Sequence, residues 1–245
     1  MMKFNIDDFG PYKLSSGSHE SPKDGMCVME MVSFLEGEEW SDRPTCTSPV
    51  IASFCRIIND RMPQEYRDRL QKRVLRLVDT VDPNLDQQRA EFLAWQAIKV
   101  YAPIALSACG FDNRARELRD FDENLGLTAA SAFTAASVSA SDVSAYAAAH
   151  SDAYAAAHSD AYAAAYAAAH SDAFTAAAYS AASAAASAAA YAVAYAAAYA
   201  EDFQVWDLVL RSLDQLLDIG SRDGVENILS EGQVDRLRDL DLVLA

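Results

Sequence analysis

Between about Ala145 and Ala200 more than half of the residues are alanine, and a larger residue recurs at every fourth position. Neither glycine nor proline occurs between Gly126 and Gly220, and alanine has the highest helix propensity. At about 100° per residue, a spacing of four moves each larger side chain by roughly 40°, so the row winds around a straight helix. A heptad seam repeats every 3.5 residues or so instead. The tract therefore predicts a long helix that meets different neighbours along its length, and not a conventional coiled coil.

The same tract leaves a helical hairpin open as an alternative. The period of four skips one step between Phe174 and Tyr179, which would suit a bend. No turn residue lies at that point, so a continuous helix is preferred.

The rest of the chain also reads as helical, because the alternating apolar pattern of strands is almost absent. The predicted class is all-α, with an N-terminal helical domain, the alanine-rich helix or hairpin, and C-terminal helices that pack back. The predicted segments are an irregular arm over 1–24, a helical domain over 25–125, the repeat helix over 126–200 and amphipathic helices over 201–245.

Capping and breaking residues indicate where individual helices begin and end. A cap at Ser48 followed by Pro49 is a strong start signal, and Pro103 lies inside an apolar run where it would kink the helix. The expected helices are Cys27–Leu35 before Gly37, one starting at Ser48, Pro63 to the break at Asp82, Leu85–Cys109, Asn113–Phe121, Phe203 to Gly220, and a weak one within Val225–Ala245.

Charge and cysteine content limit the classes of partner and compartment. The chain of 245 residues has a formal charge of −16 and a pI near 4.5. This balance argues against nucleic acid or an anionic membrane surface as a partner, since both would repel it. No secretory signal pattern, no CxxC pair and no long strongly apolar run occurs, which predicts a cytoplasmic protein without a membrane span. Its four cysteines are Cys27, Cys46, Cys55 and Cys109.

The alanine-rich tract lacks the basic side chains that would pair with acidic ones and keep an isolated helix in solution. No lysine or arginine occurs between Arg119 and Arg211. We therefore expect the tract to bury a face, either on its own domain or on a protein partner or second copy. Metal binding by His150 and His158 is a weak alternative. The two histidines lie eight residues apart, and the residue four positions from each is tyrosine and not histidine. Ice binding is a further alternative, although the repeated positions carry tyrosine and histidine where threonine would be expected.

One cluster near the N-terminus carries groups capable of chemistry. His19, Cys27, Glu30, Asp42 and Cys46 combine imidazole, thiol and carboxylate within one short stretch. Cys27 beside His19 would suit an activated nucleophile with Glu30 nearby. Zinc would be held by His19, Cys27, Asp42 and Cys46, although the spacing matches no established zinc signature.

A structural interpretation of the same residues is also open. Cys27 would then be a small buried side chain, and Glu30 or Asp42 would cap a helix or pair with Arg43. His19 would satisfy a backbone carbonyl.

Several motifs resemble a group of uncharacterised proteins from actinobacteria and their phages. The two most distinctive are the GxCxME motif of residues 25–30 and the GExWSDxPxC motif of residues 37–46. The resemblance covers about half the chain, and similar proteins carry an alanine-rich insert with a bulky residue every fourth position. It implies a helical domain and a phage or prophage origin, and no activity. The remaining shared segments are Gly17-Ser18-His19, Ser48–Ile51, Asn59-Asp60, Leu85–Ala90 and Leu213–Gly220.

These observations together favour a non-enzymatic helical interaction or scaffold protein, with no cofactor. The alternative is a small metal-dependent or thiol enzyme built on His19, Cys27, Glu30, Asp42 and Cys46. That enzyme would require the arm bearing His19 to fold back against the helix bearing Cys27 and Glu30.

Overall fold

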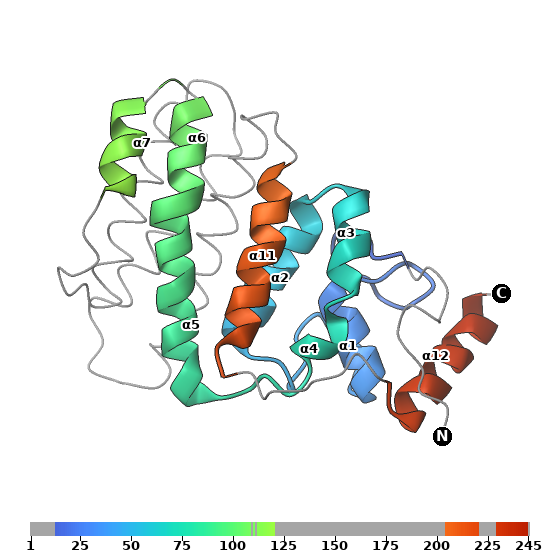
Figure 1. Cartoon of the computed structure of the whole chain (residues 1–245). Coiled ribbons are helices and arrows are strands. Elements are labelled where there is room, and N and C mark those ends of the chain that lie inside the picture. Colours follow the sequence, from blue (N-terminus) through green and yellow to red (C-terminus); the bar gives the residue numbers. More distant parts are fainter. Residues whose placement is uncertain (1–12, 109, 111, 121–203, 221–228, 245) are drawn as a thin grey trace. The chain divides into compact units, whose positions relative to one another are not determined.

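The computed structural model describes residues 13–108, 110, 112–120, 204–220 and 229–244. Every regular element in these ranges is a helix, which confirms the predicted all-α class (Figure 1). The predictions for the alanine-rich tract, including its choice of helix or hairpin, and for Cys109 lie outside the described residues. Contacts divide the chain into two compact units, Met1–Asp82 with Gly220–Ala245, and Pro83–Ile219. Each unit is described by itself.

The first unit is built around helix α1. Its neighbours in contact are α2, α4 and α12, so α1 lies at the centre of the packing. Apolar side chains such as Val28, Met31 and Leu35 are fully buried. The helices of this unit are α1 (Val28–Glu36), α2 (Pro49–Arg61), α3 (Gln64–Gln71), α4 (Val74–Leu77) and α12 (Glu231–Leu244).

The predicted ends of α1 and the start of α2 are confirmed. Gly37 ends α1 in the left-handed conformation with φ 68°, which glycine adopts without a steric penalty. Ser48 precedes Pro49, and its side chain accepts a hydrogen bond from the Ile51 amide at 3.5 Å. These local signals operate within one turn and do not need the rest of the fold.

The segment after Pro63 differs from the single helix expected there. It forms α3 and the short α4, with a turn at Lys72 and Arg73 where the Arg73 amide donates to the Leu70 carbonyl. Val74, Leu75 and Leu77 are all buried. The turn interrupts the helix directly before these buried side chains.

The C-terminal helix α12 is attached to the end of α1. Arg236 donates through Nε to the Leu35 carbonyl at 2.8 Å, and its Nη2 contacts the same oxygen. Gln233 donates to the Glu36 carboxylate at 2.7 Å. A cation at the carboxyl end of a helix satisfies carbonyls that have no partner within the helix and opposes the helix dipole.

Replacing Arg236 with alanine is expected to lower the free energy of unfolding by about 1.5–3 kcal/mol, because a charged donor is lost from a helix end. Urea unfolding followed by circular dichroism measures this change. Arg238→Ala is the matched control, since Arg238 lies on the same helix with its side chain 57% exposed. The control should stay within about 0.5 kcal/mol of wild type. Equal effects of the two substitutions would contradict the assigned contact.

The second unit contains one long helical run and two further helices. The run is α5 (Pro83–Gln96), the π-helical segment η2 (Ala97–Tyr101) and α6 (Ala102–Ala108). Figure 1 draws it as one continuous helix. Helix α7 (Asp112–Arg119) packs on α6, and α11 (Gln204–Asp218) packs on α5. A buried ion pair between Asp86 and Arg89 at 3.1 Å adds a link to the Ile219 carbonyl through Arg89.

The π-helical segment ends at Tyr101, two residues before Pro103, the residue that predicted a kink. A proline cannot donate to the carbonyl four residues earlier, and its ring collides with that carbonyl. A wider turn over residues 97–101 accommodates this local conflict. Among the described helices, none is both long and apolar enough to cross a lipid bilayer.

Candidate functional site

A closed loop holds His19 against the start of α1. The Ser15 amide donates to the Met26 carbonyl at 2.8 Å, so the two ends of the loop meet. The Met26 amide donates to Ser15 Oγ at 3.1 Å, and the Asn59 side chain donates to the Ser15 carbonyl at 2.8 Å. Residues 15–26 therefore form a compact loop with its ends hydrogen-bonded together, of the kind called an Ω-loop.

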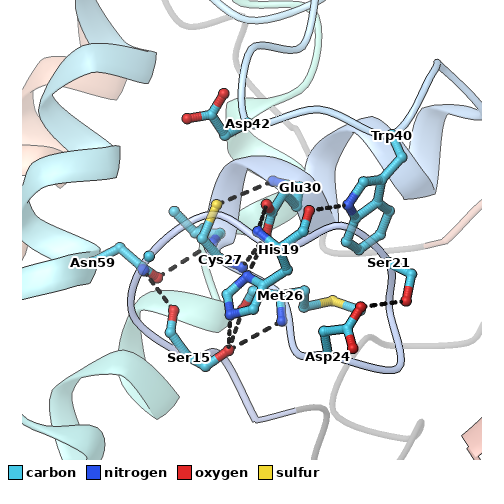
Figure 2. A network of polar contacts seen from close by, with 12 residues as sticks. Ser15, His19, Ser21, Asp24, Met26, Cys27, Glu30, Trp40, Asp42 and Asn59 are labelled. Carbon is cyan, nitrogen blue, oxygen red and sulfur yellow. Dashed lines mark hydrogen bonds and ion pairs between the residues drawn. The ribbon is translucent and has the colours of Figure 1, made fainter.

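The His19 ring contacts a side chain through each of its nitrogens (Figure 2). Nδ1 lies 2.8 Å from Glu30 Oε2, and Nε2 lies 2.9 Å from Ser15 Oγ. The ring side chain is only 9% exposed and that of Glu30 only 1%. The arm does fold back onto α1, as the enzyme alternative required. We call Ser15, His19, Met26, Cys27, Glu30, Trp40 and Asn59 the His19 network.

Glu30 is the acceptor at the centre of this network. Its Oε1 accepts the His19 amide at 2.6 Å, and its Oε2 accepts the Cys27 amide at 2.7 Å as well as the ring contact. Cys27 is the N-cap of α1, and its Sγ accepts from the Glu30 amide at 3.5 Å. This is a capping box in which cysteine replaces the usual serine or threonine. The expectation that Glu30 caps a helix is thus confirmed.

Trp40 closes the outer side of the loop. Its indole Nε1 donates to the His19 carbonyl at 2.7 Å, and its ring meets Phe34 edge-on with 6.5 Å between centroids. The His19 backbone is therefore fixed from two directions, by Trp40 at its carbonyl and by Glu30 at its amide. The expectation that His19 itself satisfies a backbone carbonyl is wrong, since its ring bonds to side chains.

The Cys27 thiol is a poor nucleophile in this setting. Burial raises its pKa to about 12, and the nearby Glu30 carboxylate opposes the thiolate further, outweighing the backbone hydrogen bonds. Only the thiolate is strongly nucleophilic, so very little of the reactive form exists near neutral pH. Cys55, which is fully buried, has its pKa raised to about 12 by the same cause.

The structure joins Asp42 and Cys46 to other partners. The Asp42 carboxylate lies 3.8 Å from Arg43 and 3.9 Å from Arg56, and no hydrogen bond links it to the network in Figure 2. The amide of Cys46 donates to Glu38 at 3.1 Å, while its Sγ lies 3.9 Å from the hydroxyl of Thr47. Burial raises the pKa of the Cys46 thiol to about 11, and Glu38 adds to the effect.

Glu38, a residue of the GExWSDxPxC motif, closes the loop that the motif forms. Its two carboxylate oxygens accept the Thr45 amide at 2.6 Å, the Thr45 hydroxyl at 2.9 Å and the Cys46 amide. Partial burial opposes the charged form, but these hydrogen bonds outweigh it and lower the pKa of Glu38. The motif thus holds a turn together between α1 and α2.

Of the predicted site residues, His19, Cys27 and Glu30 meet in one network. Among the residues that the structure describes, no group of three or more histidine, cysteine or acidic side chains is placed to hold a metal ion. Sequence reasoning missed Ser15 and Asn59. The spacing of four between Ser15 and His19 is a weak signal, and the link to Asn59 spans 44 residues and has no local signal.

Comparisons with models of protein families, with curated proteins and with solved structures found no match to this chain. The resemblance to actinobacterial and phage proteins therefore stays a prediction.

The raised thiol pKa values predict a loss of stability in alkaline solution. A group with a higher pKa in the folded chain binds more protons there than in the unfolded chain, so its contribution is complete below about pH 9. Between pH 9 and 12, each such thiol should lower the free energy of unfolding by up to about 1.4 kcal/mol per pH unit.

Urea unfolding at pH 8 and pH 10.5 measures this loss, with Cys27→Ser as the comparison. Serine keeps an N-cap acceptor without a group that titrates in this range. The variant should lose less stability than wild type between the two pH values. Equal losses would show that Cys27 does not contribute to the pH dependence.

Proposed function

We propose that this chain is a helical interaction or scaffold protein of phage or prophage origin. Its alanine-rich tract would pack on a second copy, on another protein or on its own domain. The proposal draws on the sequence for the tract, where bulky residues recur every fourth position without a single lysine or arginine. A largely apolar surface without basic charge favours burial over exposure to water.

The observation that carries the proposal is how Glu30 is used in the first unit. Its carboxylate accepts the backbone amides of His19 and Cys27, and these two contacts hold the loop and cap α1. Cys27 is likewise occupied as the N-cap, and burial raises its pKa. These groups support a structural role, and they weaken the thiol-enzyme alternative because its nucleophile is protonated near neutral pH.

The test is to replace Tyr154, Tyr162 and Tyr166 together with alanine. Native mass spectrometry and sedimentation velocity then report subunit count, and thermal melting reports stability. If the tyrosines pack, the oligomer should dissociate, or the melting temperature should fall when the tract packs within one chain. The same three positions changed to phenylalanine form the control, because the aromatic bulk is kept. Unchanged sedimentation and melting in the alanine variant would overturn the proposal.

A further inference from the structure

Independently of the interaction role, we propose that Ser15 is a base-activated nucleophile. Ser15, His19 and Glu30 form a hydrogen-bonded relay, and the relay lets the Ser15 hydroxyl take an acyl group from a small activated ester or thioester. The site is a covalent modification site with its own base.

The relay has the order that acyl transfer to serine needs. A nucleophile must contact a base, and the base must be oriented by a third group. Ser15 Oγ lies 2.9 Å from His19 Nε2, and His19 Nδ1 lies 2.8 Å from Glu30 Oε2. Both distances are within hydrogen-bond range.

The contacts of Glu30 select the tautomer of the His19 ring. Glu30 Oε2 already accepts the Cys27 amide, and Oε1 accepts the His19 amide. A carboxylate held by backbone donors acts as the acceptor for the ring too, so Nδ1 carries the hydrogen. In the neutral ring Nε2 then has its lone pair facing Ser15 Oγ. This is the tautomer that removes a proton from the hydroxyl.

Ser15 is held in place for this reaction by its backbone. Its amide donates to Met26 and its carbonyl accepts from Asn59, so the residue is fixed on both sides. Its Oγ also accepts the Met26 amide at 3.1 Å and lies 3.4 Å from the Met26 carbonyl. The shorter contact to His19 favours the ring as acceptor of the hydroxyl proton.

Ser15 lies next to an exposed part of the loop. The residue is partly exposed, and the next three residues, 16–18, are exposed. The side chains of His19 and Glu30 are largely buried. A base that contacts the hydroxyl of a partly exposed serine is the arrangement that activates serine in acyl transfer.

The reaction balances without an oxidant or a second reactant. Ser15 Oγ attacks the carbonyl carbon of the acyl donor, and the hydroxyl proton moves to His19 Nε2. The bond from that carbon to the leaving oxygen or sulfur then breaks. The alcohol or thiol leaves with the proton from Nε2, and the acyl group stays on Ser15 as an ester.

The test uses the full chain and p-nitrophenyl acetate as the acyl donor. Peptide mapping by mass spectrometry follows acetylation at each serine over time. Acetylation at Ser15 should be roughly 10²- to 10⁴-fold faster than at the exposed Ser18, the contribution typical of a positioned base. The fast acetylation of Ser15 should be lost in urea and in His19→Gln, and the rate at Ser15 should be unchanged in Ser18→Ala. Ser15→Ala should remove the label from this peptide.

Two results would overturn the proposal. One is a folded wild-type chain in which Ser15 is acetylated no faster than Ser18. The other is label that accumulates on the His19 ring, which would make the ring the nucleophile. Both are read on wild-type protein, so the decision does not depend on whether a variant folds. The assay reads covalent modification and not association, so its failure leaves the interaction role untouched.

Discussion

Replacing Glu30 with alanine is expected to lower the free energy of unfolding by about 3–5 kcal/mol, because several hydrogen-bond donors lose the acceptor that they share. The side chain is 1% exposed and accepts the amides of His19 and Cys27 together with the His19 ring. Its loss would leave three buried or partly buried donors without an acceptor, and each such donor costs about 1–3 kcal/mol. Urea unfolding monitored by circular dichroism measures the change.

Glu39→Ala is the matched control for this substitution. Glu39 is an exposed glutamate close in sequence, and its change should stay within about 0.5 kcal/mol of wild type. Glu30→Gln should fall between the two, since an amide keeps one acceptor oxygen of the same shape. A Glu30→Ala variant as stable as the control would mean that the network contributes little to folding.

Replacing Gly25 with alanine is expected to lower the free energy of unfolding by roughly 2–5 kcal/mol, from backbone strain and overpacking together. Gly25 has φ 126°, a conformation that residues with a side chain rarely adopt. An added Cβ would lie 2.4 Å from Ser15 Oγ and 2.8 Å from the His19 ring. The loop would have to open, because both neighbours are held by hydrogen bonds and cannot move aside without breaking them.

Gly17→Ala separates the two causes. Gly17 also has a positive φ of 90°, but an added Cβ there meets no atom within 4 Å. Its cost should therefore be strain alone, roughly 1–2 kcal/mol. The difference between the two variants in urea unfolding reports the clash with Ser15 and His19. Equal losses in both variants would argue against tight packing of Gly25 on the relay.

Much of the helical framework could be predicted because its signals are local. Gly37 ends α1 through its own backbone conformation, and Ser48 with Pro49 starts α2 within a single turn. The break between α3 and α4 could not be predicted, because the apolar pattern after Pro63 fits one continuous helix. Pro103 predicts a local irregularity in the helix. The sequence does not predict that this irregularity is the π-helical segment Ala97–Tyr101.

The site was predicted in part. Cys27 and Glu30 lie three residues apart, so a helix start brings them together whatever the rest of the chain does. The sequence also placed His19 in the candidate site. The spacing of residues along the chain did not predict that its ring contacts Ser15 and Glu30. The residue type of Cys27 leaves both a reactive thiol and a small buried side chain open, and burial in the folded core, which raises the pKa of the thiol, favours the second.

By itself the sequence determined the all-α class and the caps of individual helices, because helix propensity and capping act over a few residues. Only the tertiary structure decided that residues 15–26 close into a loop and that Asn59 secures it from α2. It also decided that Ser15, and not Cys27, faces the base. Such contacts depend on the meeting of segments distant in sequence, where the free energy of burial outweighs local preference. A short stretch of sequence therefore does not predict these contacts.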